Sequence, residues 1–277
     1  MRKNPVILPY DGFQDANTLL RELENDLQNI EILELLSFVK FNDAMFLPPF
    51  SGPGWIVEFW KIMEKYTLYL DIGIFLDLKL ADTSGTLKNI ATHFFASFQQ
   101  RVVKQKILTV RSNLSGKGYL EIRRVLPDVK IALVSFLTDN SEQDCLEQYG
   151  LFPEEKILHD MRIAQRKYER VRNDGDPQFA FDMVVCSPKE LPYLMRNELP
   201  IFGKRFEKIS PGIRDEWMAK GQQVRVAGVF QALKDGADYV VMGSQMKKGN
   251  PDKGISAEES RQRTKAEIER AFMEIGE

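Results

Sequence analysis

The chain has 277 residues, of which 43% are hydrophobic and 10% aromatic, so it can bury a sizeable core and is not a disordered protein. Its 38 lysines and arginines against 40 aspartates and glutamates give a net charge of −2, which argues against a nucleic-acid partner held by a global basic field. The two cysteines, Cys145 and Cys186, supply neither a disulfide framework nor a zinc pair. No apolar run is long enough to cross a bilayer, so we expect a cytoplasmic protein with no membrane partner.

Short β-branched and aliphatic runs alternate along the chain with longer amphipathic stretches. After the first run, Leu20, Leu23, Leu27 and Ile30 recur at spacings of three and four residues, which predicts a helix with one apolar face. The runs predicted to form strands are, in chain order, residues 5–10, 37–41, 73–80, 106–110, 130–137, 182–187, 205–210 and 238–243. Strands that alternate with helices indicate βα units and a parallel sheet.

Two segments are long for connections between such elements. Residues 47–55 are rich in proline and glycine and predict a loop, and residues 156–178 are charged and end in a turn cluster. At the C-terminus a helix is predicted at about residues 256–275, because Ser256 and Glu259 form a capping-box pattern and a glycine follows the last apolar position.

The number of predicted βα units decides the expected architecture. Eight units in about this length is the count for an α/β fold of the (β/α)₈ (TIM) barrel type, although a doubly wound sheet fits the same alternation. We favour a single (β/α)₈ barrel domain over residues 1–277.

The third predicted strand carries the most informative pattern in the chain. Side chains alternate along a strand, so Phe75, Asp77 and Lys79 share one face while the aliphatic residues between them share the other. The charges lie at the carboxyl end of the strand, where barrel enzymes carry their catalytic groups, and Asp82 follows directly. An ion pair that only closes the barrel mouth is the alternative, but buried charge pairs are expensive, which favours catalysis.

The loops after the last two predicted strands suggest a phosphorylated substrate. Ser-Pro-Gly at 210–212 ends one strand and Gly243 ends the next. In barrels the loops after strands 7 and 8 commonly bind phosphate through backbone N–H groups. Each signal alone is ordinary turn chemistry.

Four motifs together resemble the orotidine 5′-phosphate decarboxylase family in order and spacing. Asp11, Lys40 and Thr138 stand where that family has functional residues on strands 1, 2 and 5, so the resemblance spans nearly the whole chain. The four motifs are DLKLAD at 77–82, SPGIRDEW at 210–217, GQQVR at 221–225 and GADYVVMG at 236–243.

The resemblance implies an enzyme of pyrimidine biosynthesis that converts orotidine 5′-phosphate to uridine 5′-phosphate and CO₂. It implies that Lys79 stabilises and protonates pyrimidine C6, that Asp77 lies near the substrate carboxylate, and that Lys40 and Asp82 complete the charge array. Metal-using relatives carry an acidic ligand where this chain has Lys40, so no metal and no cofactor are implied.

The resemblance also implies residues that bind the substrate. Asp11 and Lys40 would bind the ribose, Thr138 the pyrimidine edge, and Gln223 with the backbone at Gly243 the phosphate, while Pro211 would pack against the base. In the family the last aspartate of the array reaches the partner's site. Asp82 and Thr86 therefore imply a homodimer with shared active sites.

Position 244 departs from the family pattern. The family usually has arginine after the glycine of strand 8 to grip the phosphate, whereas this chain has Ser244, which keeps a hydroxyl but loses the charge. Phosphate binding should be weak unless another cation substitutes, and the candidates are Arg214, Arg225, Lys247 and Lys248. The departure leaves two alternatives open: a related barrel enzyme for another phosphorylated substrate, and a non-catalytic barrel that binds a nucleotide or a protein.

Overall fold

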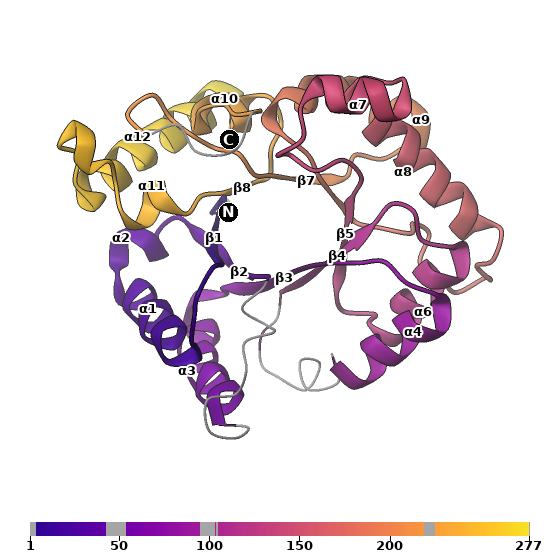
Figure 1. Cartoon of the computed structure of the whole chain (residues 1–277), viewed down its shortest axis with the longest axis horizontal. Coiled ribbons are helices and arrows are strands. Elements are labelled where there is room, and N and C mark those ends of the chain that lie inside the picture. The colour runs from indigo at the N-terminus through magenta and orange to yellow at the C-terminus, as the bar shows by residue number, and fades with distance from the viewer. Residues whose placement is uncertain (1–3, 43–53, 95–102, 104, 219–224, 277) are drawn as a thin grey trace.

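The computed structural model describes residues 4–42, 54–94, 103, 105–218 and 225–276. Eight parallel strands form a closed barrel in which each strand pairs with the next in the chain and β8 pairs with β1 (Figure 1). This closure confirms the predicted (β/α)₈ barrel and excludes the doubly wound sheet. The strands are β1 (Val6–Tyr10), β2 (Leu36–Phe41), β3 (Gly73–Leu80), β4 (Lys106–Arg111), β5 (Lys130–Val134), β6 (Met183–Val185), β7 (Glu207–Ser210) and β8 (Tyr239–Val241).

The helices lie around the outside of the barrel, where they cover the outward faces of the strands (Figure 1). The longer ones are α1 (Ala16–Gln28), α3 (Gly54–Leu70), α6 (Gly116–Val125), α7 (Glu142–Tyr149), α8 (Pro153–Glu169), α9 (Leu191–Phe202) and α12 (Ala257–Ile275). The shorter ones are α2 (Ile30–Leu33), α4 (Ser84–Asn89), α10 (Val229–Lys234) and α11 (Ser244–Lys247), with a π-helix at Ile90–Phe94 and 3-10 turns at Pro188–Glu190 and Pro251–Lys253.

The first predicted helix is confirmed except at its end. Leu20, Leu23 and Leu27 face the core from α1, but Ile30 begins α2 and is 66% exposed. The break occurs at Asn29, whose side chain accepts hydrogen bonds from the backbone N–H groups of Glu31 and Ile32 and so caps α2.

The C-terminal helix is also confirmed, as α12. Ser256 caps it by accepting from the Glu259 N–H, and Gly276 ends it in the left-handed conformation. The segment 156–178 is not the connecting chain that its charge suggested, because most of it lies in α8. Ile157, Met161, Ala164 and Tyr168 give that helix a buried face at helical spacing. The predicted loop at 47–55 lies mostly outside the described residues.

The barrel interior begins with one apolar layer to which every strand contributes a single residue. Phe38 and Tyr239 meet edge to face within it, with ring centroids 5.3 Å apart. Gly73 leaves room for the Phe38 ring, because a Cβ at residue 73 would lie 2.3 Å from it. The layer consists of Ile7, Phe38, Phe75, Ile107, Ala132, Met183, Ile209 and Tyr239. It closes the barrel below the pocket and leaves the carboxyl ends of the strands for chemistry.

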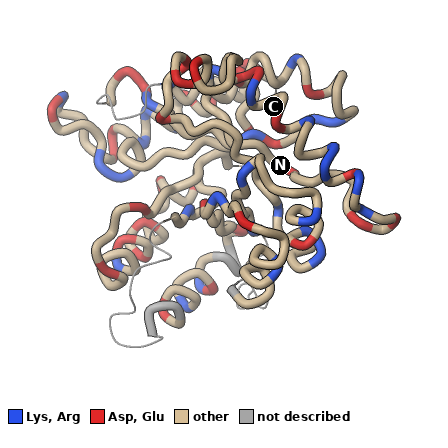
Figure 2. Tube along the Cα trace, turned by 45° about the vertical axis from the view of Figure 1, so that its right-hand side comes forward, with Lys and Arg blue, Asp and Glu red and all other residues tan. Residues whose placement is uncertain are grey.

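Charged residues of both signs are interspersed over the outer helices (Figure 2). The outer helices therefore carry charges of both signs away from the barrel mouth. None of the helices in the described part of the chain is both long and apolar enough to cross a membrane.

Candidate active site

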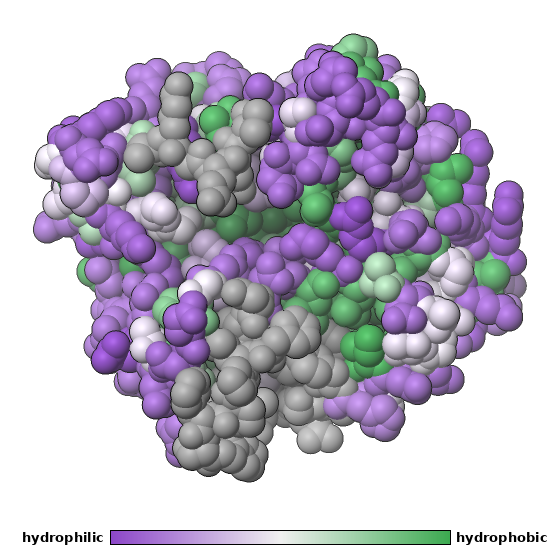
Figure 3. Space-filling model, viewed as in Figure 1, coloured by the Kyte–Doolittle hydropathy of each residue, from purple (hydrophilic) through white to green (hydrophobic). Residues whose placement is uncertain are grey.

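A pocket of about 600 Å³ opens at the carboxyl ends of the strands. The space-filling view shows a hollow at the barrel mouth, bordered by both hydrophilic and hydrophobic residues (Figure 3). Of the residues predicted to form the site, those that line it are Asp11, Lys40, Asp77, Lys79, Thr138, Pro211, Gly243 and Ser244. Segments from both ends of the chain therefore meet in one site.

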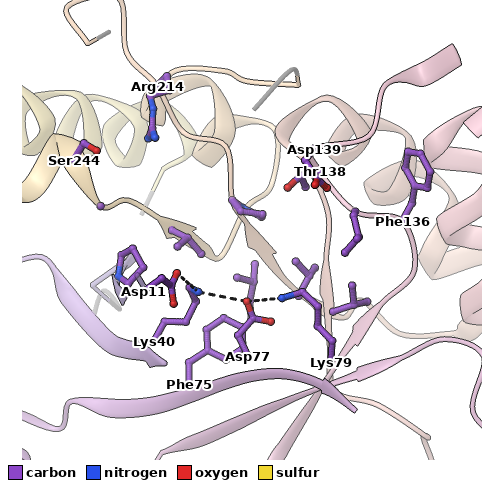
Figure 4. A pocket seen from close by; sticks show the side chains of 18 residues that line it. Asp11, Lys40, Phe75, Asp77, Lys79, Phe136, Thr138, Asp139, Arg214 and Ser244 are labelled. Carbon is purple, nitrogen blue, oxygen red and sulfur yellow. Dashed lines mark hydrogen bonds and ion pairs between the residues drawn. The ribbon is translucent and has the colours of Figure 1, made fainter. Parts of the chain in front are cut away.

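Four charged side chains form a continuous row across the floor of the pocket (Figure 4). The Lys40 Nζ lies 2.7 Å from Asp11 Oδ2 and 3.4 Å from Asp77 Oδ2. The Lys79 Nζ lies 2.9 Å from the same oxygen of Asp77. Positive and negative groups thus alternate, and each lysine is fixed by a carboxylate.

The parallel pairing of β1, β2 and β3 explains why these residues meet. Lys40 lies opposite Pro9 on one side and Phe75 on the other, so Asp11 and Asp77 follow two residues later on the flanking strands. Lys40 is only 6% exposed. A lysine buried this deeply needs partners for its charge, and two carboxylates supply them.

Thr109 of β4 contacts this row, and the sequence analysis did not identify it. Its side chain is fully buried, and its hydroxyl oxygen accepts a 2.8 Å hydrogen bond from the Lys79 N–H and lies 3.1 Å from Asp77 Oδ1. Nothing in the sequence distinguishes it from any other β-branched strand residue, since its contact depends on the register between β3 and β4. Asp139, an exposed carboxylate that lines the pocket, was also missed.

The end of the pocket near Ser244 holds one of the four candidate replacement cations. Arg214 lines the pocket on the same side as Ser244 (Figure 4). Its Nη1 donates to the carbonyl of Ile213, and no carboxylate pairs with it within the described residues. Burial lowers the pKa of the guanidinium below its usual value. A half-buried arginine without a counterion is well placed to bind an anion.

The other three candidate cations do not line the pocket. Lys247 is 2.7 Å from Glu22 and 3.3 Å from Asp26, with its Nζ 3.7 Å from the centroid of the Tyr10 ring. Lys248 is exposed on the surface. The remaining candidate, the buried Arg225, is committed to internal contacts.

Arg225 serves to support the wall of the pocket. Its Nη1 lies 2.7 Å from Glu190 Oε1, and its Nη2 donates to the carbonyl of Leu137, a residue that lines the pocket beside Thr138. Burial raises the pKa of Glu190 to about 7, although the neighbouring guanidinium opposes the rise. This buried ion pair therefore holds the loop after β5 and does not face the substrate space.

Asp82 and Thr86 do not line the pocket of the single chain. Asp82 is exposed between β3 and α4 and accepts from the Thr83 N–H, while Thr86 is exposed in the first turn of α4, with its hydroxyl 3.1 Å from that of Thr83. Gln223 lies outside the described residues. Among the described side chains, no three from histidine, cysteine, aspartate and glutamate gather as a metal-binding group.

A family model for the orotidine 5′-phosphate decarboxylase / HUMPS family matches residues 46–255. The chain belongs to this family. Proteins named orotidine 5′-phosphate decarboxylase are among its relatives. The one from Gloeothece citriformis is 26% identical over 250 residues, which cover 88% of this chain and 90% of that protein. The one from Fusobacterium nucleatum is 30% identical over 212 residues, covering 74% and 76%. A third match, to Rhodopseudomonas palustris, is 30% identical and covers 61% of this chain and 63% of that protein.

Solved structures of orotidine 5′-phosphate decarboxylases share the fold. The structure from Pyrococcus horikoshii superposes with a TM-score of 0.56 at 17% identity, covering 95% of this chain and 99% of that one. The structure from Methanocaldococcus jannaschii, complexed with the inhibitor BMP, also has a TM-score of 0.56, at 14% identity over 94% and 97%. The barrel architecture of the decarboxylase family is thus retained at low identity.

Proposed function

We infer that this protein is an orotidine 5′-phosphate decarboxylase, which releases CO₂ from orotidine 5′-phosphate and forms uridine 5′-phosphate in pyrimidine biosynthesis. The observation that carries this inference is the row of Asp11, Lys40, Asp77 and Lys79 at the barrel mouth of a chain in this family. Four alternating charges in a concave site favour catalysis over an ion-pair row that only closes the barrel mouth, because burying charge pairs is costly.

Lys79 is the group proposed to act on the reacting carbon. When the bond between C6 and the carboxylate breaks, its electron pair stays on C6, and a fixed ammonium beside that carbon stabilises the developing charge. Lys79 then donates a proton to C6 and recovers one from solvent. Its 2.9 Å contact with Asp77 supports this role, because the carboxylate fixes the position of the ammonium group.

Asp77 is proposed to lie beside the substrate carboxylate. Repulsion between the two carboxylates would be relieved as CO₂ leaves, which favours the forward reaction. Lys40 neutralises part of the charge of Asp77 and holds it in place. In this assignment the lysine stabilises the transition state and the aspartate raises the energy of the bound substrate.

The remaining pocket residues are proposed to orient the nucleotide. Asp11 and Lys40 would bind the ribose hydroxyls, Thr138 the pyrimidine edge, and Pro211 would pack against the base. At the phosphate end, Gly243 would offer its backbone, with Gln223 as a further donor. We assign the missing positive charge at position 244 to Arg214, since it lines the pocket without an ion-pair partner in the described residues.

We also propose a homodimer in which Asp82 and Thr86 complete the partner's site. Both side chains are exposed and lie beyond the carboxyl end of β3, next to the pocket but outside it. An exposed aspartate that directly follows two catalytic charges has an evident use if a second copy faces it. Residues 1–277 would form one barrel domain in each subunit, located in the cytoplasm.

The function is tested by mixing the purified protein with orotidine 5′-phosphate and following the ultraviolet change. We expect turnover without added metal, and none above background for Lys79→Ala. Turnover that survives Lys79→Ala would refute the catalytic assignment. An inactive parent protein would favour the alternatives, a relative acting on another phosphorylated substrate or a binding protein that has lost turnover.

A further inference from the structure

The backbone of Lys79 has an unusual conformation that the charge row alone does not explain. Its φ is +48°, in the left-handed region that residues with a side chain seldom adopt. The conformation coincides with an irregularity in the sheet. From Leu76 to Leu80 the partners on β4 run only from Leu108 to Val110, so β3 carries two more residues than β4 over this stretch. Asp77 and Lys79 thus lie within a bulge.

The bulge removes Lys79 from the ordinary ladder of backbone hydrogen bonds. A buried N–H that has lost its ladder partner needs another acceptor. Thr109 lies between the two β4 residues that flank the bulge, and its hydroxyl oxygen accepts from the Lys79 N–H at 2.8 Å. The threonine side chain therefore takes the place of a backbone carbonyl.

The same hydroxyl also fixes Asp77. Because the Lys79 N–H is the donor in the first contact, the hydroxyl hydrogen is available for Asp77 Oδ1, 3.1 Å away. The other carboxylate oxygen, Oδ2, faces Lys40 and Lys79. Thr109 of β4 thus holds one oxygen of Asp77 while the two lysines hold the other, and the threonine hydroxyl both accepts and donates a hydrogen bond.

We propose that Thr109 is a positioning residue that keeps Lys79 and Asp77 in register for proton transfer to C6. It does so by holding the Lys79 backbone in its left-handed conformation and by orienting the Asp77 carboxylate. The inference rests on the proposed function, and its consequence is specific. Loss of the hydroxyl alters the geometry of the reacting groups but leaves the ribose and phosphate contacts in place.

The decisive variant is Thr109→Val, which keeps the shape and removes the hydroxyl. We expect kcat for orotidine 5′-phosphate to fall about 10- to 100-fold while KM changes less than threefold, since a misplacement of about 1 Å has this effect on rate. Thr109→Ser, which restores the hydroxyl, should recover most of kcat. A Thr109→Val enzyme with parental kcat would overturn the proposal, as would equal losses in the serine and valine variants.

Thr264→Val is the matched control. Thr264 of α12 is equally buried, and its hydroxyl also donates once, to the Ser260 carbonyl, and accepts once, from Gln245. It lies outside the pocket. We expect a lower Tm with unchanged kcat, so a similar fall in kcat for both valine variants would mean that any lost buried hydroxyl slows the enzyme and would overturn the specific role of Thr109.

A measurement on the parent protein separates this inference from the proposed function. Amide hydrogen exchange and carbon chemical shifts followed by NMR should show a protected Lys79 N–H and a left-handed backbone, and Thr109→Val should lose both. These readouts need no turnover. An unprotected Lys79 amide in the parent would overturn the proposal even for an active enzyme. An inactive parent with a protected amide would refute the function and the catalytic consequence, and would leave the positioning of Lys79 and Asp77 by Thr109 in place.

Discussion

The layer of side chains at the floor of the pocket is charged or polar on one side of the barrel, here called the charged half, and apolar on the other, here called the apolar half. Immediately above the apolar layer, β2, β3 and β4 present Lys40, Asp77 and Thr109, each two residues after a member of that layer. At the corresponding positions the other five strands lead to apolar side chains that also line the pocket. These are Pro9 for β1, Val134 for β5, Val185 for β6, Pro211 for β7 and Val241 for β8.

The difference between the halves explains how a nearly neutral chain can handle an anionic substrate. The charged half concentrates its ions in one row, which in the proposed function faces the reacting carbon. The apolar half offers an apolar wall, against which we propose that the flat base packs, and its own buried ion pair, Glu190 with Arg225, lies behind that wall. Ions that face a low-dielectric surface act more strongly than ions in water.

The largest expected effect comes from breaking the charged half at Lys40. In Lys40→Met the carboxylates of Asp11 and Asp77 lose their shared cation, so we expect kcat/KM to fall about 10³-fold, equivalent to about 4 kcal/mol. Steady-state kinetics on the folded protein provide the measurement. Lys247→Met is a matched control, because Lys247 also bridges two carboxylates, Glu22 and Asp26, outside the pocket. Comparable losses of kcat/KM in both variants would contradict a special role for the charged half.

Phe38 belongs to the apolar layer below the charged half but does not line the pocket, so it should affect stability alone. Phe38 precedes Lys40 by two residues and is 1% exposed. Phe38→Ala should lower the free energy of unfolding by about 3–5 kcal/mol through lost burial and the cavity left behind. Denaturant unfolding measures that loss, and kcat per folded molecule should stay within about threefold of the parent. A variant that is stable but slow would show that the two layers are not separable.

The ion pair behind the apolar wall should make stability depend on pH. Burial raises the pKa of Glu190 from 4.5 to about 7, so between these pH values the native state binds a proton that the unfolded state does not. Its contribution to the free energy of unfolding therefore falls as pH rises through this window, by on the order of 3 kcal/mol. Urea unfolding of Glu190→Gln, which mimics the protonated form, should show a stability difference from the parent that grows in the variant's favour from pH 4.5 to 7. A stability difference that does not change between pH 4.5 and 7 would refute the raised pKa of Glu190.

At the open end of the apolar half, Arg214 should affect substrate binding. Arg214→Ala should raise KM about 10- to 100-fold, since a charge-assisted contact to phosphate is worth about 1.5–3 kcal/mol. Lys248→Ala, which removes an exposed cation outside the pocket, should leave KM unchanged. Equal KM values for the two variants would mean that Arg214 does not replace the arginine absent at position 244.

The smallest expected effect concerns the backbone of Lys79, within the charged half. Both Lys79→Ala and Lys79→Gly remove the ammonium, but only glycine relieves the left-handed conformation at φ +48°. We expect the glycine variant to be more stable than the alanine variant by about 1 kcal/mol. Thermal unfolding of the two inactive proteins measures this difference, and a less stable glycine variant would show that the backbone is unstrained there.

The sequence by itself determined the features that depend on local pattern. The eight strands, the outward aliphatic face of β3, the capped C-terminal helix and the charges of Asp77 and Lys79 at a strand end are all readable from periodicity and residue type. The segment 156–178 was misjudged because its charges lie on one face of α8 and mask the buried face at helical spacing. Local sequence pattern was sufficient to predict those helices and strands whose structure depends mainly on their own residues.

Only the tertiary structure decided which distant residues meet. Arg214 follows β7 and Lys247 follows β8, so the sequence offers both as cations for the phosphate. Only Arg214 lines the pocket, whereas Lys247 pairs with the α1 carboxylates of Glu22 and Asp26. The contact between Thr109 and Lys79 depends on a bulge between β3 and β4. Register and ion-pair choice result from long-range packing, in which each side chain competes for partners that the local sequence does not specify.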